Sequence, residues 1–305
     1  MDTVIFIHGA WATPRCWRFF EPFFGDRGYR TLAPAWPCKD GDPDSQLAHP
    51  DPRMAQVGIP EIVAHYKAII LSQSQPPVLI GHSFGGLIVQ LLLDQGLGAA
   101  GIAISSVPPR GVSATGASPL RAAQKGWMLF GAPCTWRGIV PPPRRLAEEK
   151  ALRQAEGIET HLVPASRRIF WQLFTSAAAI DFRNAGRPPL LLVACGKDRC
   201  LPVSAQRRNW ERYSASSART DFALFPDLTH LAIAEPGHAV LAAYCLAWAQ
   251  DHSDRHNSVP QFLPSRGTVG GGTQALGHGR PASRACPSPR DTPLKPSAPS
   301  AKMSA

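Results

Sequence analysis

Short apolar runs alternate with helix-period segments along the chain as far as Gln250. The runs are bounded by Gly or Pro, a pattern typical of buried strands in a parallel sheet that helices cover on both faces. We therefore expect an α/β fold with a mostly parallel sheet. The predicted strands are Thr3–Ile7, Tyr29–Ala33, Val78–Ile80, Ala100–Ser105, Leu190–Ala194 and Asp221–Phe225.

Two connecting segments carry helix signals. Thr13 followed by Pro14 is typical of an N-cap and a first helical residue, and predicts a helix that ends near Gly25–Gly28. Apolar residues recur at helical spacing over Ile59–Ile70, which predicts a second helix with one apolar face. Residues 35–58 are rich in Pro, Asp and Gly without periodicity, so we expect a long surface loop there.

Residues 108–187 interrupt the alternation of strands and helices. The segment is too long for a plain crossover connection, which predicts an inserted, mainly helical cap between core segments 1–107 and 188–252. Most of its aromatic side chains are expected to form a small core of the cap, while a minority face a substrate pocket. The aromatic residues concerned are Trp127, Phe130, Trp136, Phe170, Trp171, Phe174 and Phe182, of which Trp127, Phe170 and Phe174 are the pocket candidates.

The last segment, residues 253–305, is rich in Pro, Ser, Gly and Arg and has almost no aromatic residues. Such a composition predicts a disordered tail. The tail holds seven Lys or Arg against two acidic residues, a net of +5 out of the chain's formal +10. The other +5 is spread over about 250 residues, an ordinary solvated surface that predicts no nucleic-acid binding by the body.

The seven cysteines are odd in number and lack the short paired spacings of zinc sites, so we expect reduced thiols and no metal. Met1-Asp2 leads directly into the apolar Val4–Ile7, without the basic segment and cleavage site of a signal peptide. No apolar stretch approaches the roughly twenty residues that a membrane span requires. These features predict a cytoplasmic protein.

A G-x-S-x-G motif stands between a predicted strand and an apolar, helix-like segment, in the sequence VLIGHSFGGLIV at residues 78–89. A nucleophile elbow requires this order, because its strained turn exposes a serine hydroxyl above the sheet. Gly81 and Gly85 leave the room that such a tight bend needs. Ser83 is therefore the candidate nucleophile. A phosphate-binding loop, the alternative for a glycine-rich helix start, would require a lysine that is missing here.

Two backbone N–H groups are candidates for an oxyanion hole near Ser83. The N–H of Phe84 lies at the positive end of the helix that follows the elbow. The Ala10 N–H is the second candidate, because Gly9 allows the loop after the first strand to turn toward Ser83.

Three further side chains flank these turns. Trp11 would hold the loop after the first strand or line the substrate pocket. His8 and His82 each stand beside a turn glycine, where an imidazole can bond to backbone groups. We therefore expect structural roles for both histidines.

The H-G-A-W loop at residues 8–11 and the H-S-F-G-G-L elbow at residues 82–87 resemble the α/β-hydrolase fold family. Small soluble members of that family, the hydroxynitrile lyases and plant esterases, share the first motif, and bacterial α/β hydrolases share the second. The resemblance covers roughly Thr3 to Gln250 and weakens across the cap, where family members differ most. It implies an α/β-hydrolase fold and an enzyme that needs no cofactor.

The family order of nucleophile, acid and histidine implies that the other two catalytic residues follow the cap. Asp198 comes after the apolar run Leu190–Ala194 within G-x-D-x-x-x-P. Active sites of open α/β sheets gather at the carboxyl ends of strands, so Asp198 is the candidate acid, which would orient the imidazole and stabilise its charged form. Asp227 is the reserve candidate, although it lies only three residues before the candidate histidine.

His230 follows the last predicted strand, in the loop before the final helix, which is the family's place for the base. A neutral imidazole can take the Ser83 proton near neutral pH and return it to a leaving alkoxide. His238 competes for this role, but it falls within the opening of the predicted final helix.

These residues predict a serine hydrolase that cleaves a carboxylic ester through an acyl-enzyme on Ser83, and the aromatic cap indicates an apolar small-molecule substrate. A lactone is an alternative substrate. A lyase or other cofactor-free enzyme on the same fold is a second class, because hydroxynitrile lyases keep the triad and add a cap lysine, for which Lys125 and Lys150 are available. A non-catalytic binder is a third class, which the complete Ser–Asp–His set disfavours.

Overall fold

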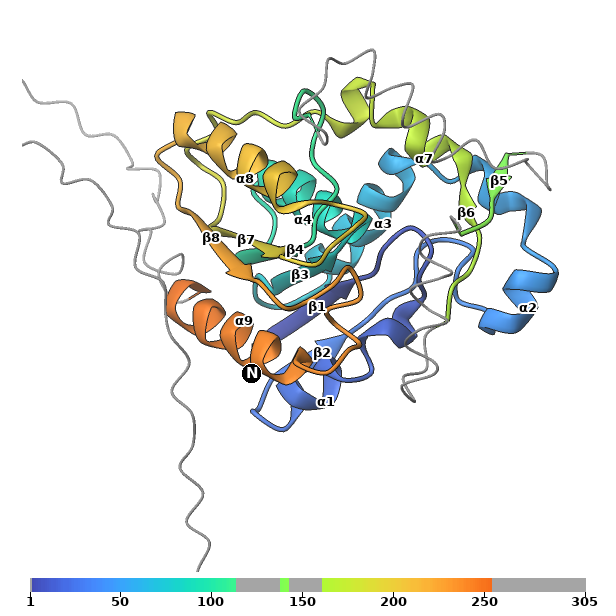
Figure 1. Ribbon diagram of the computed structural model, residues 1–305, viewed down its shortest axis with the longest axis horizontal. Helices are drawn as coiled ribbons and strands as arrows, with labels where there is room; N and C mark the ends of the chain where they lie inside the picture. Colours follow the sequence, from blue (N-terminus) through green and yellow to red (C-terminus); the bar gives the residue numbers. More distant parts are fainter. Residues whose placement is uncertain (1, 114–137, 143–160, 254–305) are drawn as a thin grey trace, which may run out of the picture. The chain divides into compact units, whose positions relative to one another are not determined.

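A computed structural model describes residues 2–113, 138–142 and 161–253 of the chain. The centre of the protein is a six-stranded sheet in the order β2-β1-β3-β4-β7-β8, in which every neighbouring pair is parallel (Figure 1). All six predicted strands are confirmed, with bounds that differ from the expected ones by at most two residues. The strands are β1 (Thr3–Ile7), β2 (Arg30–Leu32), β3 (Val78–His82), β4 (Ala100–Ile104), β7 (Leu190–Cys195) and β8 (Thr220–Phe225).

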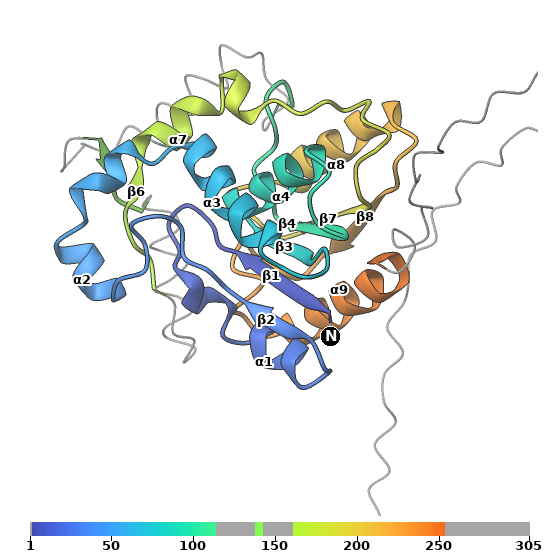
Figure 2. The same ribbon diagram turned by 180° about the vertical axis from the view of Figure 1, so that it is seen from behind.

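Helices cover both faces of the sheet (Figures 1 and 2). Each face has its own buried cluster of apolar side chains. Every residue of β1, β3, β4 and β7 is buried, which explains why their sequences are continuous apolar runs. One face carries α3 (Ile59–Leu71), α4 (Phe84–Asp94) and α8 (Val203–Arg212), and the other carries α1 (Phe20–Gly25) and α9 (His238–Ser253).

The segment after β1 differs from the single helix that the sequence predicts. It forms a 3-10 helix at Pro14–Trp17 and then α1, and Thr13 makes no side-chain cap hydrogen bond. Pro22 explains the break, because proline is tolerated in the first turn of a helix but disrupts a helix interior. The prediction of one continuous helix is therefore wrong.

Residues 35–58 are not the featureless loop that their composition predicts. They contain α2 (Pro43–Ala48) and a 3-10 helix at Pro52–Gln56. The carboxylate of Asp42 accepts hydrogen bonds from the N–H groups of Asp44 and Ser45, both at 3.1 Å, and each helix has a proline in its first turn. The Asp and Pro residues that suggest a loop are thus helix-start residues.

The described parts of the predicted cap contain a short helix and a two-stranded ribbon. The helix is α7 (Arg167–Gln172), and the ribbon pairs β5 (Ile139–Val140) with β6 (Ala165–Ser166) in antiparallel fashion. Trp127, Phe130 and Trp136 lie outside the described residues, and so does the predicted tail after Ser253.

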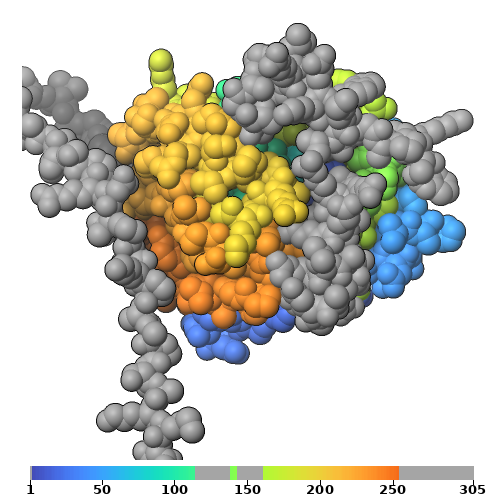
Figure 3. All heavy atoms as spheres, in the orientation of Figure 1, coloured from blue at the N-terminus to red at the C-terminus, as the bar shows by residue number. Residues whose placement is uncertain are grey.

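The second core segment, from β7 to α9, forms a continuous part of one face, coloured yellow to orange in the space-filling view (Figure 3). Within the described ranges, no helix combines the length and the apolar character needed to cross a membrane.

Candidate active site

Ser83 occupies a strained turn between β3 and α4. Its φ of 56° lies in the left-handed region, which a residue other than glycine adopts rarely. A Cβ atom on Gly81 would lie 2.2 Å from the carbonyl oxygen of Gly85, and a Cβ on Gly85 would lie 2.0 Å from that of Ile7. Both positions therefore require glycine, as the elbow motif predicts.

The fold brings Asp198 and His230 to Ser83 from distant parts of the chain. Asp198 lies in the turn after β7, and His230 lies in the loop between β8 and α9. The Nε2 atom of His230 lies 3.1 Å from Ser83 Oγ, and its Nδ1 atom lies 2.8 Å from Asp198 Oδ2. A continuous hydrogen-bonded chain thus joins the candidate acid, base and nucleophile.

The Asp198 carboxylate is buried and fully engaged. Its Oδ1 atom accepts hydrogen bonds from the N–H groups of Cys200, at 2.7 Å, and Leu201, at 2.8 Å. Burial alone would raise the pKa of Asp198, but the charge and hydrogen bond of His230 and the Leu201 N–H outweigh burial and lower the pKa. The carboxylate is therefore ionised near neutral pH, as its predicted role requires.

His82 and His8 bond to backbone, as the sequence predicts. His82 Nε2 donates to the carbonyl oxygen of His230 at 2.7 Å. His8 Nε2 accepts from the Trp36 N–H at 3.1 Å, which leaves its proton on Nδ1 for the Gly9 carbonyl at 2.9 Å. Burial is the main reason that the pKa of each histidine falls to about 3, so both rings are neutral near pH 7.

The two candidate oxyanion donors flank Ser83. The Phe84 N–H belongs to the first residue of α4, where a helix provides no partner for it. The loop after β1 passes over the nucleophile, because a Cβ on Gly9 would lie 3.1 Å from Ser83 Cβ and 3.5 Å from its Oγ. Ala10, the next residue, is buried, and its N–H meets no acceptor among the described residues.

The competing residues lie elsewhere. Asp227 is exposed and pairs with Lys197, with a distance of 3.1 Å between its carboxylate and Nζ. His238 is the first residue of α9, as expected, and its ring stacks on Phe19 with the ring centroids 4.5 Å apart.

The four predicted pocket residues, Trp11, Trp127, Phe170 and Phe174, differ in their surroundings. Trp11 stacks on Phe170 with ring centroids 4.9 Å apart, and Phe170 meets Phe84 edge to face at 5.9 Å, so both rings lie beside the elbow. Phe174 is 56% exposed. Trp127 lies outside the described residues.

Thr229 and Glu235 close the loop that carries His230, and neither residue is identified by the sequence analysis. The buried carboxylate of Glu235 accepts a hydrogen bond of 2.6 Å from the Thr229 N–H and one of 2.9 Å from its hydroxyl. Threonine beside the histidine and glutamate five residues after it were the available signal, but both residue types are common on surfaces.

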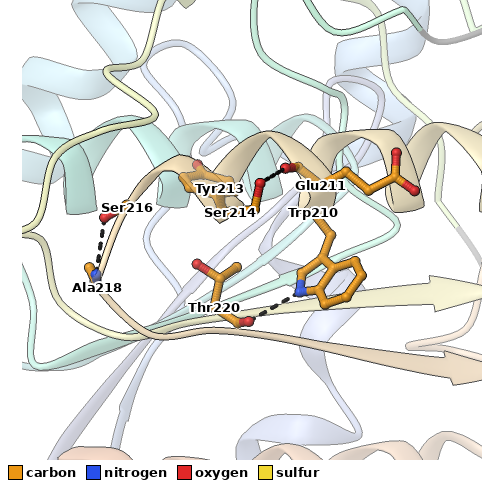
Figure 4. A pocket seen from close by; sticks show the side chains of 7 residues that line it. All are labelled: Trp210, Glu211, Tyr213, Ser214, Ser216, Ala218 and Thr220. Carbon is orange, nitrogen blue, oxygen red and sulfur yellow. Dashed lines mark hydrogen bonds between the residues drawn. The ribbon is translucent and has the colours of Figure 1, made fainter. Parts of the chain in front are cut away.

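A hollow at the C-terminal end of α8 is separate from these residues (Figure 4). Its polar groups largely bond within the protein. The Trp210 Nε1 donates to the Thr220 carbonyl at 3.1 Å, and the Ser214 hydroxyl donates to the Glu211 carbonyl at 2.7 Å. No member of the Ser83, His230 and Asp198 chain lines it.

One group of side chains in the described part of the chain could bind a metal ion. Asp198, Cys200 and His230 each offer a ligand atom, and these atoms lie within 4.8 Å of one another. Both Asp198 oxygens and both His230 nitrogens already take part in hydrogen bonds. A cation would therefore have to replace the bonds that join these residues to Ser83.

The chain matches the family model described as "Alpha/beta hydrolase family" over residues 4–243. A pyrethroid hydrolase from Sphingobium faniae has the same fold, with 19% identity, a TM-score of 0.61, and coverage of 82% of this chain and 97% of that one. A methylesterase from Arabidopsis is 15% identical, with a TM-score of 0.54 and coverage of 82% and 100%. Polyneuridine aldehyde esterase is 16% identical, with a TM-score of 0.57 and coverage of 82% and 100%.

No curated protein sequence is similar enough to match the chain. The family model nevertheless spans most of its length, including the elbow and the loops that carry Asp198 and His230. The protein therefore belongs to the alpha/beta hydrolase family.

Proposed function

We propose that the protein is a serine hydrolase that cleaves a carboxylic ester of an apolar small molecule. The observation that carries this proposal is the hydrogen-bonded chain from Asp198 through His230 to Ser83, which ends on a strained nucleophile elbow. This arrangement supplies a nucleophile, a base in contact with it, and an ionised acid that orients the base.

In the acylation step, His230 Nε2 takes the proton of Ser83 as Oγ attacks the ester carbonyl. The resulting oxyanion accepts hydrogen bonds from the N–H groups of Phe84 and Ala10, which meet no other acceptor among the described residues. Asp198 stabilises the imidazolium. His230 then gives its proton to the leaving alkoxide, so that an alcohol departs and Ser83 carries the acyl group.

In the deacylation step, a water molecule replaces the alcohol. His230 takes one proton from this water as its oxygen attacks the acyl carbonyl, and the oxyanion returns to the same two N–H groups. Collapse of the tetrahedral intermediate releases the carboxylic acid and returns the proton to Ser83 Oγ.

The surroundings of Ser83 favour an apolar substrate. Trp11, Phe84 and Phe170 form a cluster of aromatic rings beside the elbow. The proteins of similar fold reported above, a pyrethroid hydrolase and two esterases, agree with ester cleavage. A lactone would pass through the same steps with its alcohol still attached to the acyl group. The lyase alternative depends on Lys125 or Lys150, which lie outside the described residues.

The test compares the parent with Ser83→Ala, using a fluorophosphonate probe and nitrophenyl esters of increasing chain length. We expect the variant to lose labelling and at least about a thousandfold in turnover. Ser214→Ala is the control. Ser214 lines the separate hollow of Figure 4, so this variant should retain full activity. Ester turnover in Ser83→Ala within about tenfold of the parent would contradict the proposal.

A further inference from the structure

Lys39 is a lysine whose side chain is buried beside the loop that follows β1. Its side chain is only 2% exposed, and no carboxylate among the described residues lies within ion-pair distance. Burial is the main cause that lowers the pKa of Lys39 to about 7. A buried ammonium group is costly unless hydrogen bonds compensate for its lost hydration. The Lys39 ammonium group therefore needs hydrogen-bond acceptors within the protein.

Those contacts are with the loop that follows β1. The Lys39 Nζ donates to the carbonyl oxygen of Ala10 and lies 3.5 Å from that of Ala12. It also lies 5.6 Å from the centroid of the Trp36 ring. Lys39 itself is held by a turn in which its N–H bonds to the Trp36 carbonyl at 2.9 Å. The ammonium group thus ties the turn at residues 36–39 to the loop at residues 8–12.

The backbone on the other side of Ala10 is fixed by different groups. The Gly9 carbonyl accepts from His8 Nδ1 at 2.9 Å and from the Ala12 N–H at 3.3 Å. Because a peptide unit is planar and trans, its N–H points away from its carbonyl. The Gly9 carbonyl and the Ala10 N–H belong to the same peptide unit, so the bonds to this carbonyl help to orient the Ala10 N–H.

Lys39 fixes the next peptide unit, which begins with the Ala10 carbonyl. Among the described residues, its ammonium group is the one donor to that carbonyl. With both flanking peptide units held, the φ and ψ angles of Ala10 are determined. Without Lys39, the Ala10 carbonyl would lose this donor, and the loop at residues 8–12 would lose its tie to the turn at residues 36–39. The loop as a whole, and the Ala10 N–H with it, could then shift relative to Ser83.

We propose that Lys39 is a positioning residue that holds Ala10 in the conformation needed to bind the oxyanion. This inference rests on the ester hydrolysis proposed above. The proposed role of Lys39 is in transition-state stabilisation, because its ammonium group bonds to the backbone of the loop. Substrate binding depends on the aromatic rings beside the elbow.

The test uses Lys39→Met, which keeps an unbranched side chain as far as Cε and removes the ammonium donor. Loss of one oxyanion donor costs about 100- to 1,000-fold in turnover, so misalignment of one donor should lower kcat about 10- to 100-fold. We expect KM to change less than about threefold, because ground-state contacts remain. Lys67→Met, on the exposed side of α3, is the matched control and should retain parent activity.

A transition-state analogue separates this role from a general structural one. An aryl trifluoromethyl ketone forms an oxyanion adduct with the serine, whereas the corresponding alcohol binds without one. In Lys39→Met, the Ki of the ketone should rise by the same factor by which kcat/KM falls, and the Ki of the alcohol should stay constant. Equal affinity of the ketone for parent and variant would overturn the inference.

Two controls keep the outcome interpretable. If the parent shows no Ser83-dependent hydrolysis, the proposed function fails before Lys39 is tested. If Lys39→Met does not fold by circular dichroism, Lys39→Gln, which retains an N–H donor at shorter reach, is measured instead. Loss of folding in both variants would overturn the inference in favour of a purely structural lysine.

Discussion

His82, the residue before the nucleophile, donates a hydrogen bond of 2.7 Å to the backbone carbonyl of His230, the candidate base. The two imidazole centroids are 5.0 Å apart. The strand that presents Ser83 therefore also holds the loop that presents its base. A displacement of β3 would therefore carry this loop with it, so that both members of the reacting pair move together.

The first prediction concerns the acid sensitivity that neutral His82 imposes. Its folded pKa of about 3 lies below the ordinary 6.5, so between these values the unfolded chain binds more protons and stability falls as the pH falls. Each such histidine contributes a slope of about 1.4 kcal/mol per pH unit in the free energy of unfolding. In His82→Gln, which keeps an N–H donor, urea denaturation between pH 6 and 4 should show a slope smaller by this amount. An unchanged slope would mean that His82 is protonated in the folded protein.

The second prediction separates the two candidate acids. Asp198→Asn should lower kcat by about 1,000-fold or more, because the amide can no longer stabilise the imidazolium or fix its tautomer. Asp227→Asn should stay within about twofold, since its carboxylate pairs with Lys197 at the surface. Steady-state kinetics on one nitrophenyl ester measure both. The opposite ranking of the two variants would transfer the acid role to Asp227.

The third prediction tests the close approach of the loop after β1 to the nucleophile. In Gly9→Ala the new methyl group would lie 3.1 Å from Ser83 Cβ, so the loop or the serine must shift by a few tenths of an ångström. We expect kcat to fall at least about tenfold, because alignment within the site is lost. Gly25→Ala is the matched control, since its added carbon would meet nothing within 4 Å. Similar activities in the two variants would show that the loop tolerates displacement.

The fourth prediction concerns substrate binding. Phe170→Leu removes the ring that stacks on Trp11 and meets Phe84, so KM for esters with aromatic or long acyl groups should rise about tenfold, with a smaller change for acetate esters. Phe174→Leu should leave KM unchanged, because that side chain is exposed. A larger effect at Phe174 than at Phe170 would place the pocket on the outer side of α7.

The strands and the elbow could be predicted from the sequence because their determinants are local. β1, β3, β4 and β7 are buried on both faces and therefore appear as continuous apolar runs. The elbow needs glycine at fixed offsets from Ser83, and these offsets are visible without a structure. Local chemistry can also mislead, since the Asp and Pro residues at 42–52 suggest a loop but begin two short helices.

Lys39 could not be predicted in the same way. Its partners are the carbonyl groups of Ala10 and Ala12, and backbone acceptors leave no signature in a sequence. The Cys-Lys-Asp-Gly context of Lys39 is that of an exposed turn. Only the packing of the turn at residues 36–39 against the loop at residues 8–12 buries this side chain.

The contacts of Gly81 and Gly85 have a consequence for how this enzyme can diversify. The shortest of these contacts join the nucleophile strand, its helix and β1 directly through main-chain atoms. Side chains elsewhere can therefore be exchanged without moving Ser83. Mutations that reshape the surrounding aromatic surface can alter substrate preference while the reaction centre keeps its geometry, so selectivity and chemistry can evolve separately in this chain.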